Sequence, residues 1–170
     1  MNILLTGGNG LVGKNILEHP NCAHHTFHSP SSSSLNLLDK EAIKYYFLQN
    51  NFDLVIHAAG IVGGINANIT KPVSFLKDNT EMGINIISAS KASGIKNFIN
   101  LASSCMYPRN ARNPLSEDLI LSGELEPTNE GYALAKIVCM KLCEYITKED
   151  PAYRYKTIIP CNLYGRHDNF

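Results

Sequence analysis

The stretch NILLTGGNGLVG, residues 2–13, decides how this chain folds. Its first five residues form a short apolar run, which is typical of a buried strand, and the glycines that follow predict a tight turn. These glycines fit the pattern G-x-G-x-x-G, and the segment from Leu11 to His19 is predicted to be a helix that ends before Pro20. A glycine turn between a strand and a helix presents backbone N–H groups and the positive end of the helix dipole to a pyrophosphate. This context favours dinucleotide binding over a purely structural turn.

Beyond this stretch, predicted strands and helices alternate along the chain. Because strands separated by helices form parallel sheets, we predict an α/β fold: a Rossmann-like doubly wound parallel sheet with helices on both faces. Residues 1–170 are expected to form one dinucleotide-binding domain. The irregular stretch 103–130 begins where a strand ends, which is where open α/β sheets bind ligands, so we expect it to be functional. The further strands are expected at 26–28, 54–59, 97–102 and 155–163, and the further helices at 39–50, 72–93 and 132–147.

The composition excludes several classes of protein. With 44% hydrophobic residues among 170, the chain can bury a core and is not intrinsically disordered. Fifteen Lys and Arg balance fifteen Asp and Glu, so no charge excess predicts binding to nucleic acid or to a membrane surface. The five cysteines are scattered and lack zinc spacing, so no metal site is expected. With no leader-like start and no run of about 18 apolar residues, the chain is expected to be cytoplasmic.

The residues that would select the cofactor are not apparent. An acidic residue about 20 positions after the glycine motif would bind the ribose 2′-hydroxyl of NAD, whereas a nearby arginine would accommodate the 2′-phosphate of NADP. Residues 24–34 contain neither type of residue. The hydroxyls of Ser31–Ser34 either bind a phosphate or belong to a solvated linker, and Asp39 either lies near the adenine or caps the following helix. The choice between NADP(H) and NAD(H) therefore stays open.

A second motif indicates catalysis. Tyr132 and Lys136 form Y-x-x-x-K, a spacing that places both side chains on one face of a helix. Ser103 follows the predicted fourth strand. A lysine ammonium beside a tyrosine is expected to lower the phenol pKa from about 10, and the serine hydroxyl can bind the same carbonyl oxygen as the phenol. Together these groups would protonate and polarise a ketone while a nicotinamide delivers hydride.

The segment SSCMYP at residues 103–108, together with EPTNEGY at 126–132 and NLYGRHDNF at 162–170, resembles the short-chain dehydrogenase/reductase superfamily in its extended, nucleotide-sugar branch. The resemblance implies a GDP-sugar substrate, GDP-4-keto-6-deoxymannose, that is epimerised at C3 and C5 and reduced at C4 with NADP(H). It implies that Ser103, Tyr132 and Lys136 serve the reduction and that Cys105 serves the epimerisation. The cofactor-binding residues that we expect are Gly7, Gly8, Asn9, Gly10, Leu11, Val12, Gly13, Asp39, Ala58, Ala59, Gly60, Leu101, Ala102, Ser103, Ser104, Tyr132, Lys136, Pro160, Cys161, Asn162 and Leu163.

The resemblance also bears on assembly and on the extent of the chain. The superfamily forms homodimers through the two long helices, at 72–93 and 132–147 here. The family continues beyond Phe170 into a substrate-binding domain, so this chain is expected to hold the cofactor half and to turn over poorly or not at all. Six apolar residues on these helices either form the seam of the dimer or face the sheet. They are Phe75, Met82, Ile86, Leu134, Val138 and Leu142.

Three functions are compatible with these motifs. The first is the epimerase/reductase. The second is a related nucleotide-sugar reductase or epimerase, for example one acting on a GDP-keto-heptose. The third is a non-catalytic dinucleotide-binding protein. Among residues outside the motifs, His57 is expected to be a hydrogen-bonded core histidine, and Cys139, Cys143 and Cys161 to be small core residues.

Overall fold

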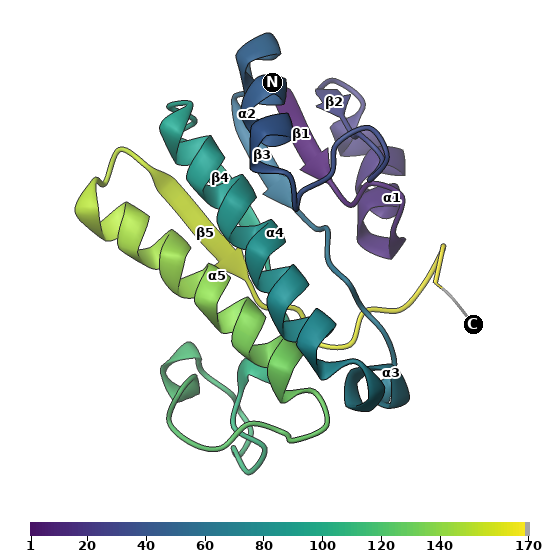
Figure 1. Ribbon diagram of the computed structural model, residues 1–170, viewed down its shortest axis with the longest axis vertical. Coiled ribbons are helices and arrows are strands. Elements are labelled where there is room, and N and C mark those ends of the chain that lie inside the picture. The colour runs from purple at the N-terminus through teal and green to yellow at the C-terminus, as the bar shows by residue number, and fades with distance from the viewer. Residues whose placement is uncertain (169–170) are drawn as a thin grey trace.

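A sheet of five parallel strands forms the centre of the molecule. The computed structural model describes residues 1–168 and gives the strand order β2-β1-β3-β4-β5 (Figure 1). Every neighbouring pair is parallel. This arrangement confirms the predicted α/β class. The strands are β1 (Asn2–Thr6), β2 (Thr26–His28), β3 (Leu54–His57), β4 (Asn97–Leu101) and β5 (Arg154–Ile158).

Helices connect the strands. Asp39 begins one of them: its carboxylate accepts hydrogen bonds from the backbone N–H groups of Glu41 and Ala42, as expected of a helix cap. Gly94 follows the longest helix and has a φ of +75°, a backbone conformation that glycine adopts without steric cost. The α-helices of the described chain are α1 (Leu11–Glu18), α2 (Lys40–Gln49), α3 (Ile65–Thr70), α4 (Pro72–Ala92) and α5 (Glu130–Glu149), and the 3-10 turns are η1 (Pro20–Cys22), η2 (Ser104–Met106) and η3 (Glu117–Leu119).

The main hydrophobic core lies between the sheet and the helices α2, α4 and α5. The side chains of Leu4, Val55 and Phe98 enter it from neighbouring strands and are fully buried. Val55 and Phe98 are partners in the parallel register, so their side chains share one face of the sheet. The helices α4 and α5 lie side by side across this face (Figure 1). Burial of each such side chain stabilises the fold by about 1.5–3 kcal/mol.

The opposite face of the sheet is covered at β1 and open at β5. Ile3 and Leu5 alternate with Leu4 and are also buried, so both faces of β1 are covered. A right-handed connection from β1 to β2 places α1 on the face opposite to α2, α4 and α5. At the other edge, Arg154 and Ile158 of β5 are exposed. Helices thus cover both faces, as predicted, but unequally.

Some element boundaries differ from the expected ones. The third and fifth strands end earlier, at His57 and Ile158, so that residues 58–59 and 159–163 run as irregular backbone beside the sheet. Pro160 has no N–H to donate to a neighbouring strand, which is consistent with the early end of β5. The glycine-rich segment after β3 contains the short helix α3, whose N-cap residue Gly64 has no side chain that could signal a helix start.

His57 is a core histidine, as expected. Its ring is buried, and Nδ1 lies 2.8 Å from the hydroxyl oxygen of Thr6 on the adjacent strand. Burial lowers the His57 pKa from 6.5 to about 3, and the positive charge of Lys136 lowers it further in the same direction. The imidazole is therefore neutral in the folded protein at physiological pH.

This buried histidine makes folding stability depend on pH. Between pH 6.5 and about 3 the unfolded chain binds a proton at His57 that the folded protein does not bind, so stability falls as the pH falls. Between about pH 7 and about pH 5, we expect His57 to remove about 2 kcal/mol of the unfolding free energy. Urea denaturation at both pH values measures this loss of stability. The His57→Gln variant should not show the loss, whereas the control His24→Gln, at an exposed site, should show it in full. An equal loss in the His57→Gln variant would assign the pH dependence to other groups.

Candidate functional site

The turn after β1 has a backbone that only glycine permits. Gly7 has a φ of +77°, and a Cβ at this position would lie 2.6 Å from the backbone nitrogen of Ala59. A Cβ at Gly13 would lie 2.3 Å from the carbonyl oxygen of Gly7, so only glycine lets α1 pack this close to the turn. Gly10 caps α1 without a side-chain hydrogen bond, which leaves the first N–H groups of the helix open. The geometry suits the close approach of a pyrophosphate.

A cavity of about 700 Å³ lies next to this turn, at the carboxyl edge of the sheet. It extends from the glycine turn, past the segment after β3, to the end of β4 and the start of α5. Parallel strands of open α/β sheets bind their ligands at this edge. The predicted site residues that line the cavity are Gly7, Gly10, Leu11, Val12, Gly13, Ala58, Ala59, Gly60, Leu101, Ala102, Ser103, Tyr132, Lys136, Pro160, Cys161, Asn162 and Leu163.

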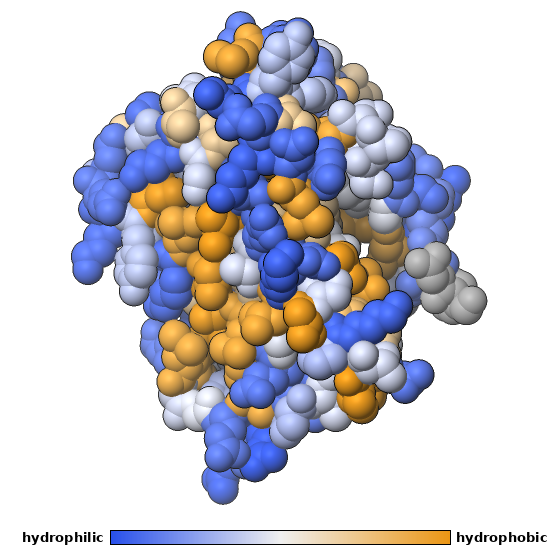
Figure 2. All heavy atoms as spheres, in the orientation of Figure 1, coloured by the Kyte–Doolittle hydropathy of each residue, from blue (hydrophilic) through white to orange (hydrophobic). Residues whose placement is uncertain are grey.

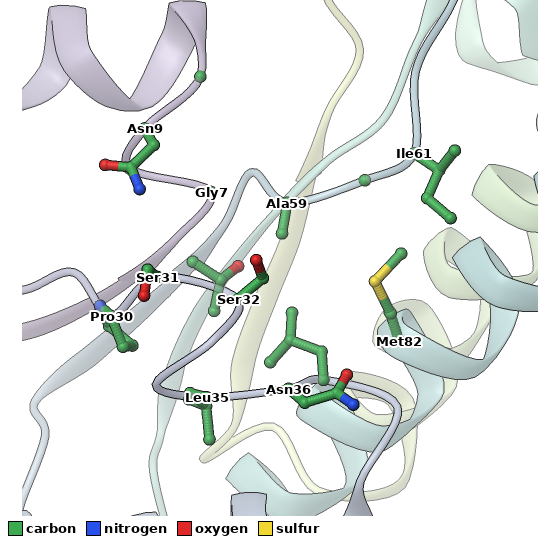
Figure 3. Close-up of a pocket in the computed structure, with 15 residues that line it drawn as sticks. Gly7, Asn9, Pro30, Ser31, Ser32, Leu35, Asn36, Ala59, Ile61 and Met82 are labelled. Atoms are coloured by element: carbon green, nitrogen blue, oxygen red, sulfur yellow. The ribbon is translucent and has the colours of Figure 1, made fainter.

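A second cavity, of about 280 Å³, continues from the first toward β2 (Figure 3). Gly8 and Asn9, which do not line the larger cavity, line this one together with Ser31 and Ser32. The two cavities share Gly7, Gly10, Ala59 and Gly60 in their walls, so they form one elongated path over the ends of β1 and β3. A path of this shape fits a molecule with two ends joined by a pyrophosphate at the glycine turn.

Lys136 is a buried cation at the floor of the larger cavity. Its ammonium donates a hydrogen bond to the carbonyl oxygen of Leu101 at 2.9 Å and lies 5.5 Å from the centre of the Tyr132 ring. A Cβ at Gly60 would come 3.7 Å from the same nitrogen. Burial lowers the pKa of Lys136, and nearby Cys139 and Cys105 oppose this shift. The lysine is thus held in place by the backbone of β4, one helical turn from the phenol.

Tyr132 differs from expectation in its acidity. Burial raises the pKa of the phenol to about 12, and the neighbouring Cys105 acts in the same direction. The expectation that Lys136 lowers this pKa below 10 is therefore wrong, because burial desolvates the phenolate and is the largest cause of the shift. The phenol is protonated at neutral pH, which is the form that donates a proton.

Ser103 and Cys105 lie where β4 ends. The Ser103 hydroxyl accepts a hydrogen bond from the backbone N–H of Cys105 at 3.4 Å and begins the 3-10 turn η2. Cys105 is half-buried and packs against a small cluster that contains Met106 and Ala133 of α5. Burial raises the pKa of the Cys105 thiol, although the Ser103 hydrogen bond and the Lys136 charge pull it down. Cys105 lies beside the larger cavity but is not part of its wall.

Other predicted residues lie elsewhere. Asp39 caps α2 and lines neither cavity, so of its two proposed roles the structure shows the cap. Ser104 also lines neither, and its backbone N–H donates to the carbonyl oxygen of Pro160 at 3.1 Å. Cys139 and Cys143 are buried, as expected of core residues, whereas Cys161 is exposed and lines the larger cavity, so its expected core position is wrong.

The family of the chain follows from a comparison with known proteins. Residues 3–170 match the NAD dependent epimerase/dehydratase family. The chain belongs to this epimerase/dehydratase family. Curated relatives include GDP-L-colitose synthase of Yersinia pseudotuberculosis, which is 56% identical over 170 residues, and GDP-L-fucose synthase of Azorhizobium caulinodans, which is 49% identical over 168 residues. The two alignments cover 100% and 99% of this chain, but 55% and 54% of the relatives.

A solved structure of the epimerase/dehydratase type shows the same fold. A GDP-L-fucose synthetase from Naegleria fowleri bound to NADP superposes with a TM-score of 0.89 at 31% sequence identity, over 99% of this chain and 56% of that chain. The chain thus spans about half the length of the relatives that it matches. The epimerase/dehydratase fold and the glycine turn are in the half that it covers.

Asn79 of α4 is a buried residue that sequence reasoning missed. Its side-chain oxygen accepts from the backbone N–H of Ile61 at 2.7 Å, and its side-chain nitrogen donates to the carbonyl oxygens of Ile61 and Phe75. These bonds fix the segment after β3, which lines both cavities. An asparagine in the middle of a long helix, with Phe75, Leu76 and Met82 three or four positions away on the same face, is a weak signal for such a role. Val62 and Gly63, which line the larger cavity, also lie on this segment.

Two further observations concern residues 1–168. In this range, no three His, Cys, Asp or Glu side chains gather closely enough to hold a metal ion. None of the helices formed by these residues has the length and apolarity needed to cross a bilayer. The cytoplasmic location and the lack of nucleic-acid binding stay predictions for this epimerase/dehydratase family member.

Proposed function

We propose that this chain supplies the NADP(H)-binding and catalytic residues of an enzyme that converts GDP-4-keto-6-deoxymannose to GDP-L-fucose. The main support is that Ser103, Tyr132 and Lys136 line one cavity with the glycine turn, although they lie far apart in the sequence. Cys105 lies beside them, two residues after the serine. The names of the relatives support GDP-sugars as the substrate class.

Ser103, Tyr132 and Lys136 each have a role in the reduction. When bound, the nicotinamide supplies hydride to C4 of the sugar. Tyr132 donates its phenolic proton to the C4 carbonyl oxygen as negative charge develops there, and the Ser103 hydroxyl donates a hydrogen bond to the same oxygen. Lys136, anchored on the carbonyl oxygen of Leu101, stabilises the phenolate that remains. The hydroxyl at C4 is the product of this step.

The epimerisation uses the acidity of the protons next to the ketone. The thiolate form of Cys105 takes the proton from C3 or C5, and the electron pair of the broken C–H bond moves into the C4 carbonyl to form an enolate. Ser103 and Tyr132 stabilise the enolate oxygen by hydrogen bonds. The enolate then collapses to the ketone as the carbon takes a solvent-derived proton on its opposite face, which inverts the carbon.

A second candidate product is GDP-L-colitose. It is favoured by the higher identity of the chain to a GDP-L-colitose synthase, 56% against 49% for a GDP-L-fucose synthase. Both candidates assign the same roles to Ser103, Cys105, Tyr132 and Lys136, and they differ in the sugar that is bound. Product analysis by NMR separates them.

The experiment that tests the proposal is incubation of the chain with NADPH and GDP-4-keto-6-deoxymannose in deuterated buffer. Loss of the reduced-nicotinamide absorbance reports hydride transfer, and NMR of the product reports deuterium at C3 and C5. We expect both signals, at a low rate because the chain spans about half the length of its relatives. Cofactor binding without either signal would instead favour the non-catalytic dinucleotide-binding protein.

We also propose that the chain forms a homodimer through α4 and α5. Figure 2 shows apolar residues gathered over these two helices on the viewed face of the molecule. Val73, Leu76 and Val138 are large apolar side chains exposed there. Of the expected seam, Val138 is exposed, whereas Phe75 and Ile86 are buried, so Val73 and Leu76 take their place in the proposed interface. Sedimentation of the chain that gives only the monomer mass would contradict this proposal.

A further inference from the structure

The smaller cavity carries no ionic charge. Within the described residues, its wall is made of glycines, apolar side chains, serines, asparagines and Thr6, with no Asp, Glu, Lys or Arg. The sequence explains why: from residue 19 to residue 38, which includes the whole segment after β2, there is no acidic residue, lysine or arginine. Asp39, the first carboxylate after this segment, is engaged in capping α2. The cavity therefore has no fixed charge that would attract or repel an anion.

Hydroxyl and amide groups line the cavity instead. Figure 3 shows Ser31 and Ser32 on the segment after β2, opposite Asn9 and Ala59. The Ser31 hydroxyl is shared with Ser33 and Ser34, at 2.8 Å and 3.0 Å. Ser32 is exposed and forms no hydrogen bond with another residue in the range 1–168. Asn36 uses its side-chain oxygen to accept from the Leu38 N–H, which leaves its NH₂ group to donate.

We infer that this cavity holds the adenosine ribose of the dinucleotide and accepts NADP(H) and NAD(H) with affinities within about tenfold of each other. The inference rests on the dinucleotide binding of the proposed function. It goes beyond that function because it assigns cofactor selectivity, or the lack of it, to the segment after β2. Ser32 is the residue that we place beside the 2′ position of this ribose.

The chemistry of the 2′ position explains why the affinities for NADP(H) and NAD(H) are expected to be similar. A phosphate monoester carries close to two negative charges at neutral pH, and enzymes that select it use arginine, whose charge-assisted hydrogen bonds are about twice as strong as neutral ones. Enzymes that select the 2′-hydroxyl use a carboxylate, which also repels the phosphate. Serine hydroxyls and an amide NH₂ donate to either group and repel neither. Neutral donors thus give a phosphate only a modest advantage.

Equilibrium binding tests the inference without any turnover. The chain is titrated with NADH and with NADPH, followed by nicotinamide fluorescence, at low and at high salt. We expect the two dissociation constants to differ by less than about tenfold, and we expect their ratio to change little with salt because no cationic side chain lines the cavity. A ratio above tenfold in either direction overturns the inference but leaves dinucleotide binding intact. Binding of neither cofactor overturns the proposed function and the inference together.

A carboxylate introduced at Ser32 locates the ribose. Ser32→Asp should weaken NADPH binding by about tenfold or more through like-charge repulsion and leave NADH binding within about threefold of the wild type. Ser93→Asp is the control, because Ser93 is an exposed serine that lines neither cavity and, within residues 1–168, has no side-chain hydrogen bond to the serines of the site. We expect this control to keep the wild-type ratio. An unchanged ratio in Ser32→Asp, or an equal change in both variants, overturns the placement of the ribose at Ser32.

Discussion

Replacement of Tyr132 by phenylalanine is expected to slow ketone reduction by about 10²–10⁴-fold, the usual contribution of a positioned general acid. Only the phenolic oxygen is removed, so the ring keeps its edge-to-face contact with Phe75 and the helix keeps its packing. We do not expect the nearby Ser103 hydroxyl, which is neutral, or the Lys136 ammonium, which the carbonyl oxygen of Leu101 already holds, to replace the phenol as the acid. Stopped-flow or steady-state loss of NADPH absorbance measures the effect.

A matched control separates the loss of the Tyr132 phenol from a general effect of replacing a tyrosine on this helix. Tyr145 lies on the same helix, is exposed and lies outside both cavities, so Tyr145→Phe should reduce the ketone at the wild-type rate. Dissociation constants for NADPH should be the same in all three proteins within about twofold. A Tyr132→Phe variant with an unchanged reduction rate would show that the proton comes from another group.

The second large effect is expected from Cys105→Ser. A serine hydroxyl is far less acidic than a thiol, so proton removal from C3 and C5 should slow by about 10²–10⁴-fold. Deuterium incorporation at these carbons, followed by NMR in deuterated buffer, measures the loss. Reduction at C4 should continue, which gives a product that keeps the substrate's configuration at C3 and C5. The control is Cys22→Ser, a cysteine in the turn after α1 and outside the larger cavity.

The same thiol gives epimerisation a pH dependence. Burial raises the pKa of Cys105 above its ordinary value, so the thiolate is a minor form at neutral pH. Below this pKa, the thiolate fraction rises about tenfold for each pH unit, and the rate of deuterium incorporation by the wild-type protein should rise in parallel. A rate independent of pH between about 6 and 8, or wild-type incorporation by Cys105→Ser, would contradict a thiolate base.

Much of the fold follows from short-range patterns in the sequence. The apolar run Asn2–Thr6 before the glycines predicts β1, and Asp39 at the start of an apolar-periodic segment predicts the cap of α2. These features depend on residues within a few positions of one another. The short helix α3 escapes prediction because its start has no capping side chain and its six residues are too few to show a periodic pattern.

The candidate site is predictable in its residues but not in its electrostatics. The glycine turn and the Y-x-x-x-K spacing identify Gly13, Tyr132 and Lys136 from sequence alone. The raised pKa of Tyr132 cannot be predicted in this way, because it depends on how much of the phenol is buried by segments distant in sequence. The role of Asn79 likewise appears only when α4 packs beside the segment that follows β3.

The position of β1 within the sheet constrains how the protein can assemble during its synthesis. This first strand is hydrogen-bonded on one side to β2 and on the other to β3, and Ile3 pairs with Leu54. At about 5–20 residues per second, the ribosome needs several seconds between making these two residues. Until Leu54 is made, the edge of β1 that pairs with β3 has no partner, and an unpaired edge of an apolar strand can pair with another chain.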